Sequence, residues 1–399
     1  MSILTINAGS SSLKIGQFDD DAKRRLSEGA FDWSTAPHHA VLTVTHANGN
    51  RTESKLGIPD DCDALTHGVR LLIESDILCA DIRTSVHAVG HRVVHGGTVF
   101  SESVVIDDQT KSAIDRLSQL APLHNPQALR AINAAQNALP EATQIAVFDT
   151  SFFADLAPRA FVYPLPYAWY EDWGIRRFGF HGISHRYCAQ RAAELLGHDS
   201  DGLRVVTCHL GNGCSATAVK SGEAVATTMG FTPLEGLMMG SRAGSIDPAI
   251  LLHVQHHHGM DVAQLDHALN HASGLLGVSG VSSDLRQIEA AAKDNTQAQL
   301  AMQIYSDRVR SAIGALAVTM GGVDALVFTG GVGQNSPKMR SSACEGLECL
   351  GLKLDENKNK RCRTDADIAN EQSLGHILVL RTREEFMIAR EAHRVMKQA

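Results

Sequence analysis

Six charged or imidazole side chains stand in the polar turns that interrupt the apolar runs of this chain. They are Arg92 in GHRVVHGG, His124 in PLHNP, Asp149 in IAVFD, His181 in FGFHGISH, Arg242 in MMGSRAGSIDP and Glu384 after ILVLRTR. Arginine and histidine can stabilise negative charge on a phosphoryl or carboxylate group, and a carboxylate can bind a metal ion. Each residue alone also has an ordinary explanation, such as a helix cap or a surface ion pair. Together they indicate chemistry on an anionic substrate.

Four segments are typical of a buried strand that runs into a polar or glycine-rich turn: AVGHRVVHGG, QIAVFDT, LRVVTCHLGNG and DALVFTGGVG. In α/β sheets, ligands bind beyond the carboxyl ends of the strands, which is where these turns lie. Strand-like and helix-like segments alternate along the chain. The pattern therefore predicts an α/β architecture.

Three helices are predicted from their capping residues. NPQALRAINAAQNAL has Asn125 as its N-cap, and the helix after His181 has Ser184 as its N-cap and Gly197 at its end. DPAILLHVQHHHG has Asp247 as its N-cap and Gly259 as its stop.

One pattern occurs twice. LTINAGSSSLKIG and VTCHLGNGCSATAV each combine an apolar strand, a polar residue, a small polar loop and a second strand. Asn7 aligns with His209, about half the chain later. This echo predicts two related domains with a ligand cleft between them, whereas two unrelated hairpins are the plain alternative.

The glycine loops fit no common phosphate-loop pattern. A P-loop needs a Gly-Lys pair that opens a helix, but Lys14 lies in strand-like sequence. GNGCSA has the outline of a dinucleotide fingerprint, yet CSATAV continues as a strand rather than a helix. GGVGQNSPKMR is a better strand–glycine–helix junction for an anion. Several such loops in two halves of one chain favour a nucleotide cleft.

Composition sets the outer bounds. A chain of 399 residues is too long for one ordinary core, so we expect two domains. The formal charge of −8 argues against a nucleic-acid partner, and no apolar run reaches the ~18 residues that span a bilayer. The start, MSILTINAGS, shows no secretory signal, and the eight cysteines include no CxxC pair. We therefore expect a cytoplasmic protein with unpaired thiols.

Nine ordered motifs resemble those of the acetate kinase family across essentially the whole chain. They are NAGSSSLK, GHRVVHGG, APLHNP, VFDTSF, FGFHGISH, CHLGNG, TPLEGLMMGSRAGSIDP, FTGGVGQN and TREEF. The resemblance implies the acetate and sugar kinase/actin-like ATPase superfamily, with two duplicated ribonuclease H-like domains flanking an ATP cleft. It further implies an N-terminal domain over 1–150, joined by a C-terminal helix over 386–399, and a nucleotide-binding domain over 151–385.

The implied reaction is reversible transfer of a phosphoryl group from ATP to acetate, giving acetyl phosphate and ADP. It requires Mg²⁺, for which Mn²⁺ can substitute. Arg92 would clamp the acetate carboxylate, while His181 and Arg242, supported by His124, would stabilise charge on the transferring group.

The resemblance assigns Asn7 and Glu384 to the metal and makes Asp149 the catalytic carboxylate. Because the substrate is already ionised at neutral pH, no general base is needed. Our hypothesis is that Asp149 positions Arg242 or the metal shell.

The remaining implied contacts fall into two sets. The nucleotide contacts are Lys14, His209, Leu210, Gly211, Asn212, Gly213, Asp284, Leu285, Arg286, Gly331, Val332, Gly333, Gln334 and Asn335. The apolar pocket for the acyl methyl is Val94, Leu123, Phe180 and Pro233. Gln334 stands where the family often has Glu, and GSRAGSID departs from the commoner GTRSGDID. Ala243 and Ser245 thereby remove polar groups beside Arg242.

The resemblance also implies a homodimer with acetate and ATP as ligands, and neither nucleic acid nor membrane as a partner. Two alternatives share much of the pattern. A propionate or other short-chain carboxylate kinase has the same fold and chemistry, since one methylene is worth only ~1–3 kcal/mol in an apolar pocket. A non-catalytic, actin-like nucleotide-binding protein would keep the glycine loops but would not need Arg92, His181 and Arg242 together.

Overall fold

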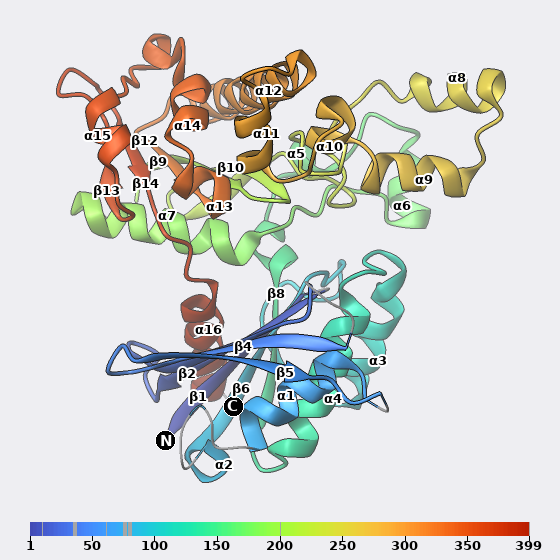
Figure 1. Ribbon diagram of the computed structural model, residues 1–399, viewed down its shortest axis with the longest axis vertical. Helices are drawn as coiled ribbons and strands as arrows, with labels where there is room; N and C mark the ends of the chain where they lie inside the picture. Colours follow the sequence, from blue (N-terminus) through green and yellow to red (C-terminus); the bar gives the residue numbers. More distant parts are fainter. Residues whose placement is uncertain are drawn as a thin grey trace. The chain divides into compact units, whose positions relative to one another are not determined.

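The computed structural model divides into two compact units. It describes residues 1–9, 11–34, 38–60, 62–74, 78, 82–199 and 201–398, so Ser10 of the first turn lies outside the described residues. Unit 1 comprises Met1–Ala154 and Arg383–Ala399, and unit 2 comprises Asp155–Thr382. Each unit is built on its own sheet (Figure 1).

Within the described residues, unit 1 contains an eight-stranded sheet in the order β5-β4-β3-β2-β1-β6-β8-β7. The strands are β1 (Ser2–Ala8), β2 (Ser12–Asp19), β3 (Arg25–Asp32), β4 (His39–His46), β5 (Arg51–Gly57), β6 (Val86–Val93), β7 (Val104–Val105) and β8 (Thr143–Phe148). β1, β6 and β8 are parallel, whereas β2 and β3 continue from β1 in antiparallel pairs. The three parallel strands therefore end at one edge of the sheet.

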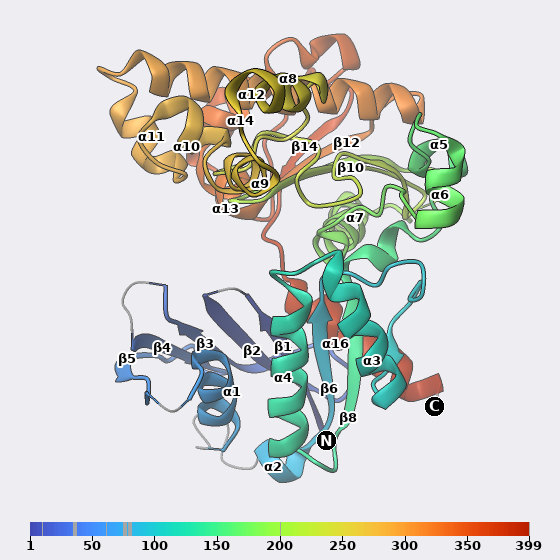
Figure 2. The ribbon, with the colours of Figure 1, turned by 90° about the vertical axis from the view of Figure 1, so that its right-hand side faces the viewer.

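Helices cover both faces of this sheet (Figure 2). They are α1 (Ala64–Glu74), α2 (Ile82–Ser85), α3 (Asp108–Arg116), α4 (Asn125–Ala138) and α16 (Glu384–Gln398). Val89 of β6 lies in one apolar core with Val69 of α1 and Ala135 of α4. A Cβ on the next residue, Gly90, would lie 2.7 Å from the Ile388 side chain of α16. Because side chains alternate along a strand, α16 packs on the face opposite to α1 and α4.

A buried histidine in β6 makes the stability of unit 1 depend on pH. Burial lowers the pKa of His91 to about 4, although its hydrogen bond to Gln144, 2.8 Å from Nε2 to Oε1, acts in the opposite direction. The unfolded chain binds this proton near pH ~6.5, so stability is retained above that pH and is lost as the pH falls towards about 4. We expect a loss of about 2 kcal/mol by pH ~5 from this group alone.

Urea unfolding at pH 7.5 and pH 5.0 measures this loss of stability. In His91→Gln, the part of the loss that comes from His91 should be absent. His46→Gln, a matched change at an exposed position of β4, should leave the wild-type pH dependence in place. An equal loss in His91→Gln and the wild type would contradict the assignment.

Unit 2 repeats the central arrangement. Its described strands are β9 (Arg204–Leu210), β10 (Cys214–Lys220), β11 (Glu223–Thr227), β12 (Ala325–Thr329), β13 (Ala366–Asp367) and β14 (His376–Val379). The order β11-β10-β9-β12-β14 matches β3-β2-β1-β6-β8 of unit 1, strand for strand and direction for direction. The predicted duplication is confirmed, and the alternative of two unrelated hairpins is wrong.

Two long helices cover the faces of the second sheet, α7 (Gly182–Leu196) and α12 (Thr296–Met320). His185 of α7 lies 2.7 Å from the Thr207 hydroxyl and 3.0 Å from the Ser215 hydroxyl. The neighbouring Cys214 instead contacts Tyr305 of α12, 3.1 Å from Sγ to the phenol oxygen. Alternation along β10 therefore places α7 and α12 on opposite faces.

Further helices of unit 2 surround this core (Figure 1). They are α5 (Pro158–Phe161), α6 (Tyr167–Trp173), α8 (Ala249–His258), α9 (Val262–His271), α10 (Gly274–Ser279), α11 (Leu285–Ala291), α13 (Gly330–Asn335), α14 (Pro337–Cys344) and α15 (Glu356–Arg361). Within the described part of the chain, none of the helices is both long and apolar enough to cross a bilayer.

The four predicted strands are confirmed as β6, β8, β9 and β12. α8 ends at Gly259 and α7 at Gly197, both in the left-handed conformation that favours glycine. The predicted Asp247 cap is one residue off, because α8 begins at Ala249 and its N-cap position is Pro248; Asp247 still accepts the Ala249 N–H at 2.9 Å. The predicted caps Asn125 and Ser184 are different, because their side chains belong to the candidate site.

Candidate active site

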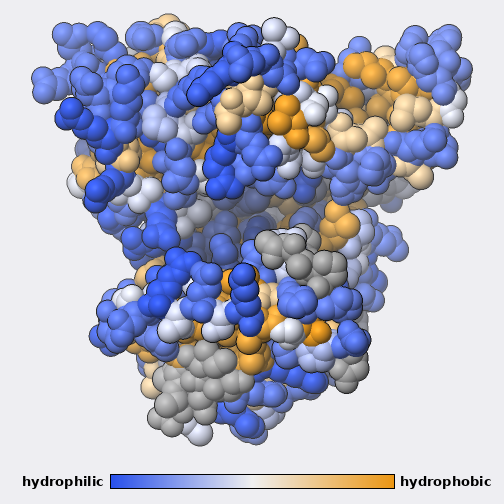
Figure 3. Space-filling view, viewed as in Figure 1, coloured by the Kyte–Doolittle hydropathy of each residue, from blue (hydrophilic) through white to orange (hydrophobic). Residues whose placement is uncertain are grey.

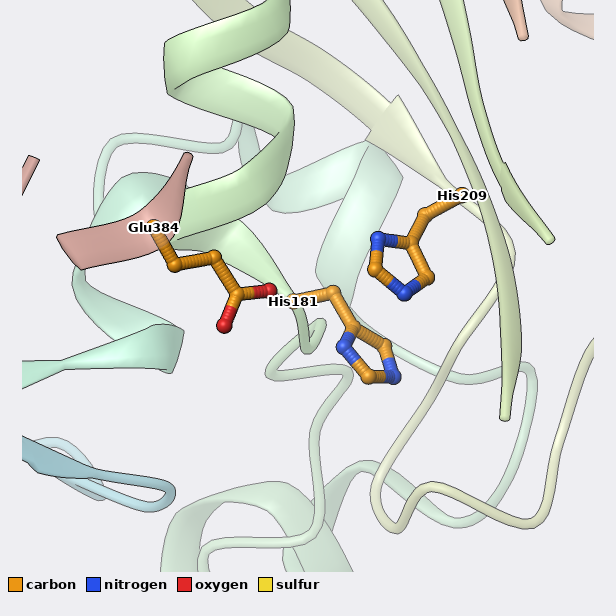
Figure 4. A group of neighbouring side chains, drawn as sticks. All are labelled: His181, His209 and Glu384. Carbon is orange, nitrogen blue, oxygen red and sulfur yellow. The ribbon is translucent and has the colours of Figure 1, made fainter. Parts of the chain in front are cut away.

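Four of the predicted residues meet in unit 1. Arg92, at the carboxyl end of β6, donates from Nη2 and Nε to Asp149 Oδ2, at 2.6 and 3.0 Å. Its Nη1 donates to Asn7 Oδ1 at 3.2 Å, and the Asn7 amide donates to Glu384 Oε2 at 3.2 Å. Glu384 (Figure 4) is the first residue of α16. Its Oε2 lies 3.7 Å from Arg92 Nη1. Three strand ends and one helix start thus converge on a single guanidinium.

The electrostatics of this cluster keep Arg92 charged and fixed. The Arg92 side chain is 18% exposed and that of Asp149 is 1% exposed. Burial alone opposes the guanidinium charge, but the carboxylates of Asp149 and Glu384 outweigh it and raise the pKa of Arg92. Among the described residues, these contacts engage three of the five N–H groups of Arg92 and leave one on each terminal nitrogen. Those two donors suit an incoming carboxylate.

Asn125 holds the backbone beyond β6 rather than capping α4. Its side-chain oxygen accepts the His95 N–H at 3.1 Å, and its amide donates to the His95 carbonyl at 3.0 Å. Thr150, next to Asp149, accepts the Gly96 N–H at 2.9 Å. The predicted Asn125 cap is therefore wrong. α4 already begins at Asn125, so this residue is inside the helix rather than before it. Its buried side chain instead satisfies the N–H and the carbonyl of His95.

Of the other predicted residues of unit 1, Lys14 lies in β2, whereas Val94, Leu123 and His124 lie on loops. Lys14 is exposed and lies opposite Asn7 in the β1–β2 pair. Val94 follows β6 and is half-buried. Leu123 is exposed, and His124 occupies the N-cap position of α4 without a side-chain cap bond.

In unit 2, the rings of His181 and His209 stack, with centroids 4.5 Å apart and planes 12° apart (Figure 4). His181 precedes α7 in the left-handed conformation, with φ of 57°, which is uncommon for a residue with a side chain. Ser184 lies 2.8 Å from His209 Nδ1 and 3.0 Å from the Thr382 hydroxyl. The predicted Ser184 cap is wrong because α7 starts at Gly182, which leaves Ser184 inside its first turn to position His209.

Arg242 lies beside the glycine loop that joins β9 and β10. A Cβ on Gly213 would lie 3.2 Å from His181 Nε2 and 3.9 Å from Arg242 Nη1, so the loop backbone approaches both side chains closely. Arg242 Nη1 also donates to the Pro233 carbonyl at 3.4 Å. Burial lowers the pKa of Arg242, with the nearby Cys214 thiol acting in the opposite direction. A bound anion would relieve the cost of burying this charge.

The predicted nucleotide loops meet at the ends of β9 and β12. Gly330 has φ of 77°, and a Cβ there would lie 2.6 Å from the Leu210 carbonyl, so only glycine fits. This contact brings Leu210–Gly213 alongside α13, which contains Gly331–Asn335. On a separate helix, Asp284 caps α11 through the Arg286 N–H and pairs with the Arg286 side chain at 2.6 Å. Phe180 is buried just before His181.

Sequence reasoning missed Arg340, which supports α13, one of the predicted nucleotide loops. It is fully buried and donates from Nη1 to the carbonyls of Gly333 and Gln334, at 2.8 and 2.9 Å, at the end of α13. Its Nε donates to Asn359 Oδ1 at 2.8 Å. The sequence did contain one signal that Arg340 is buried. Arg340 precedes Ala343 by three positions, a spacing that places both residues on the same, buried face of a helix.

We expect Arg340→Met to raise the KM for ATP and lower the melting temperature, with a smaller effect on kcat. The change leaves the carbonyls of Gly333 and Gln334 without their donor, at about 1–3 kcal/mol per buried group. Steady-state kinetics with varied ATP and a thermal melt measure both effects. Lys338→Met, on the exposed side of α14, is the control. An unchanged KM for ATP in Arg340→Met would show that α13 does not depend on this support.

Comparisons with known proteins cover the whole chain. The sequence model of the Acetokinase family matches residues 2–390. An acetate kinase from Nostoc punctiforme is 47% identical over 405 residues, which is 100% of each chain. The crystal structure of Porphyromonas gingivalis acetate kinase is 40% identical, covers 99% of each chain and superposes with a TM-score of 0.89. A propionate kinase structure from Francisella tularensis is 36% identical, with 99% coverage of each chain and a TM-score of 0.88. This chain therefore belongs to the acetokinase family.

Proposed function

We propose that this chain is an ATP:acetate phosphotransferase that reversibly forms acetyl phosphate and ADP. The observation that carries the proposal is that a full-length member of the acetokinase family holds Arg92 in a buried cluster with two donors left for a carboxylate. An acetate carboxylate is ionised at neutral pH and can attack phosphorus without losing a proton. Binding and positioning are therefore the main tasks of the protein.

In this proposal Arg92 binds the acetate carboxylate, and Asp149 fixes Arg92 through two hydrogen bonds to one oxygen. That role replaces our hypothesis that Asp149 positions Arg242 or the metal shell. Val94, Leu123, Phe180 and Pro233 remain the proposed apolar pocket for the acyl methyl.

His181 and Arg242, with support from His124, stabilise negative charge on the phosphoryl group during transfer. The closeness of His181 Nε2 and Arg242 Nη1 to the Gly213 backbone supports this role, because one anionic group beside that loop could reach both. Lys14, His209–Gly213, Asp284–Arg286 and Gly331–Asn335 remain the proposed nucleotide contacts.

We assign Asn7 and Glu384 to a divalent cation, Mg²⁺ or Mn²⁺. Amide and carboxylate oxygens are the hard donors that Mg²⁺ prefers, and Glu384 supplies the negative charge. The two side chains are adjacent, since the Asn7 amide donates to Glu384 at 3.2 Å, and the amide would have to turn its oxygen towards the cation. When bound, the cation neutralises phosphate charge on ATP. The residues' own part is to keep these oxygens at the start of α16 and the end of β1.

We propose a cytoplasmic homodimer that associates through α8 and α9. All residues of these two helices are described, and none of them is buried. Ile250, Leu252 and Val262 are exposed there, and Figure 3 shows apolar residues on the surface of unit 2 in this region. An apolar surface of this kind is typical of an interface.

The test is acyl phosphate formation, trapped with hydroxylamine, from Mg-ATP and acetate, propionate or butyrate in turn. We expect the highest kcat/KM with acetate. A higher kcat/KM with propionate would support the same mechanism but would identify propionate as the preferred substrate. No product with any acid, despite measured ATP binding, would favour a non-catalytic nucleotide-binding protein.

A further inference from the structure

A cavity lies in unit 2, behind the loop that carries Arg242. Its volume is about 310 Å³, and it opens between that loop, α10 and α12. Its walls include Ala243 and Ser245 from the loop, Gly274 and Val278 from α10, and Ile304 and Arg308 from α12. Figure 1 shows α10 beside α12, and the two helices pack against each other. None of the residues proposed above to bind acetate, ATP or metal lines this cavity.

The walls combine apolar side chains with two serines and one charged residue. Among the described residues that line the cavity, Arg308 is the only one with a charged side chain, and none carries a carboxylate. Arg308 forms no ion pair within the described part of the chain, whereas Arg310, two positions on, pairs with Asp307 and Glu345. An exposed guanidinium at the rim of a hollow that Val278 and Ile304 partly line suits an anionic head on an apolar body.

Ser245 adds a hydroxyl to the same wall. Its oxygen accepts the Gly236 N–H at 3.1 Å, which leaves its own O–H able to donate to a ligand. Ser273 also lines the cavity, but its hydroxyl donates to the Ala268 carbonyl at 2.6 Å. An aspartate at position 245, as in the commoner motif, would place a carboxylate on the same wall as Arg308 and oppose an anion.

The cavity adjoins the backbone that presents Arg242. A Cβ on Gly274 would lie 2.3 Å from the Met239 carbonyl and 2.6 Å from the Arg242 carbonyl, so α10 supports this loop directly. The Met239 N–H donates to the Arg242 carbonyl at 3.1 Å, and Ala243 is the next residue. A ligand against Ala243 and Gly274 therefore touches the support of the Arg242 loop rather than Arg242 itself.

We propose that this cavity is an effector site for a small organic monoanion, with Arg308 and Ser245 binding the acidic head and Val278 and Ile304 contacting the apolar body. Occupation acts on turnover through the Arg242 loop. The effect on turnover rests on the proposed function, whereas binding does not.

The probe is hexanoate, titrated by ligand-observed NMR against the full chain at saturating acetate, with 1-hexanol as the uncharged control. We expect saturable binding of hexanoate and at least tenfold weaker binding of hexanol. Arg308→Gln should weaken hexanoate binding at least tenfold, and Arg308→Lys, which keeps the charge, should weaken it less. Val278→Phe should block binding by filling the cavity, and Arg310→Gln should bind as the wild type does.

Thermal melts of each variant separate misfolding from a lost site. Equal hexanoate affinity in Arg308→Gln and the wild type, or no binding to the folded wild type, would overturn the proposal. In kinetics, hexanoate should change kcat rather than the KM for acetate. Displacement of hexanoate by acetate would place its carboxylate at Arg92 instead and would also overturn it. Absence of any kinase activity, with binding intact, would contradict only the proposed function.

Discussion

Arg242→Ala should lower the turnover of acyl phosphate formation by about 10²–10³-fold while the KM for ATP changes little. A preorganised donor aimed at charge that develops in the transition state is worth about this much. Arg242 is half-buried, and within the described part of the chain its guanidinium donates to the Pro233 carbonyl and contacts the Met239 sulfur, neither of which is charged, so its charge is available to an anion. Steady-state kinetics with Mg-ATP and acetate give kcat and both KM values.

Two variants make the Arg242 result specific. Arg242→Lys keeps the charge but lacks the planar fork, so it should recover part of the rate. Arg310→Ala removes a guanidinium that pairs with Asp307 and Glu345, away from the proposed site, and should match the wild type. If Arg242→Ala turned over at the wild-type rate, Arg242 would have no part in the transition state.

Ala243 and Ser245, which differ from the commoner family motif, do not disrupt the loop that carries Arg242. The Ser245 N–H donates to the Gly236 carbonyl at 2.9 Å, and the Ser245 hydroxyl accepts the Gly236 N–H at 3.1 Å. These paired bonds close the loop at its base. Ala243 keeps a backbone bond to the Leu269 carbonyl at 3.1 Å. Because the loop geometry depends on backbone contacts, we expect the substitutions at 243 and 245 to change the cavity behind it more than the position of Arg242.

Local patterns predicted the strands and the duplication well. A strand that ends in a polar turn depends on the order of apolar and small residues, which is visible in the sequence around Asn7 and His209. The matching strand orders of the two sheets show that the repeated sequence pattern corresponds to a repeated structure. Helix ends at Gly197 and Gly259 were equally predictable, because a left-handed residue after a helix favours glycine.

The side-chain partners could not be predicted in the same way. Asn125 and Ser184 have the residue types of caps, but each has partners that lie far away in the sequence, His95 and His209. A cap and a tertiary hydrogen bond require the same chemistry, so residue type alone cannot separate them. The choice depends on which backbone groups the fold buries nearby.

Asp149→Asn should lower kcat/KM for acetate by about 10²–10³-fold, mainly through the KM for acetate. The change removes the charge that faces Arg92 Nε and Nη2 in a buried pair, and breaking such a pair costs about 3–5 kcal/mol. Arg92 would still be charged but would no longer be held in one orientation. The KM for ATP should change little, and a thermal melt measures the accompanying loss of stability.

A double-mutant cycle separates a positioning role for Asp149 from an independent one. If Asp149 acts through Arg92, then Asp149→Asn should cost little more once Arg92 is already alanine, because the group it positions is gone. Near-normal turnover of Asp149→Asn in the wild-type background would contradict any catalytic or positioning role. Additive losses in the cycle would mean that Asp149 acts on the metal shell or the substrate directly. The two N–H bonds from Arg92 to one carboxylate oxygen make the non-additive result the expected one.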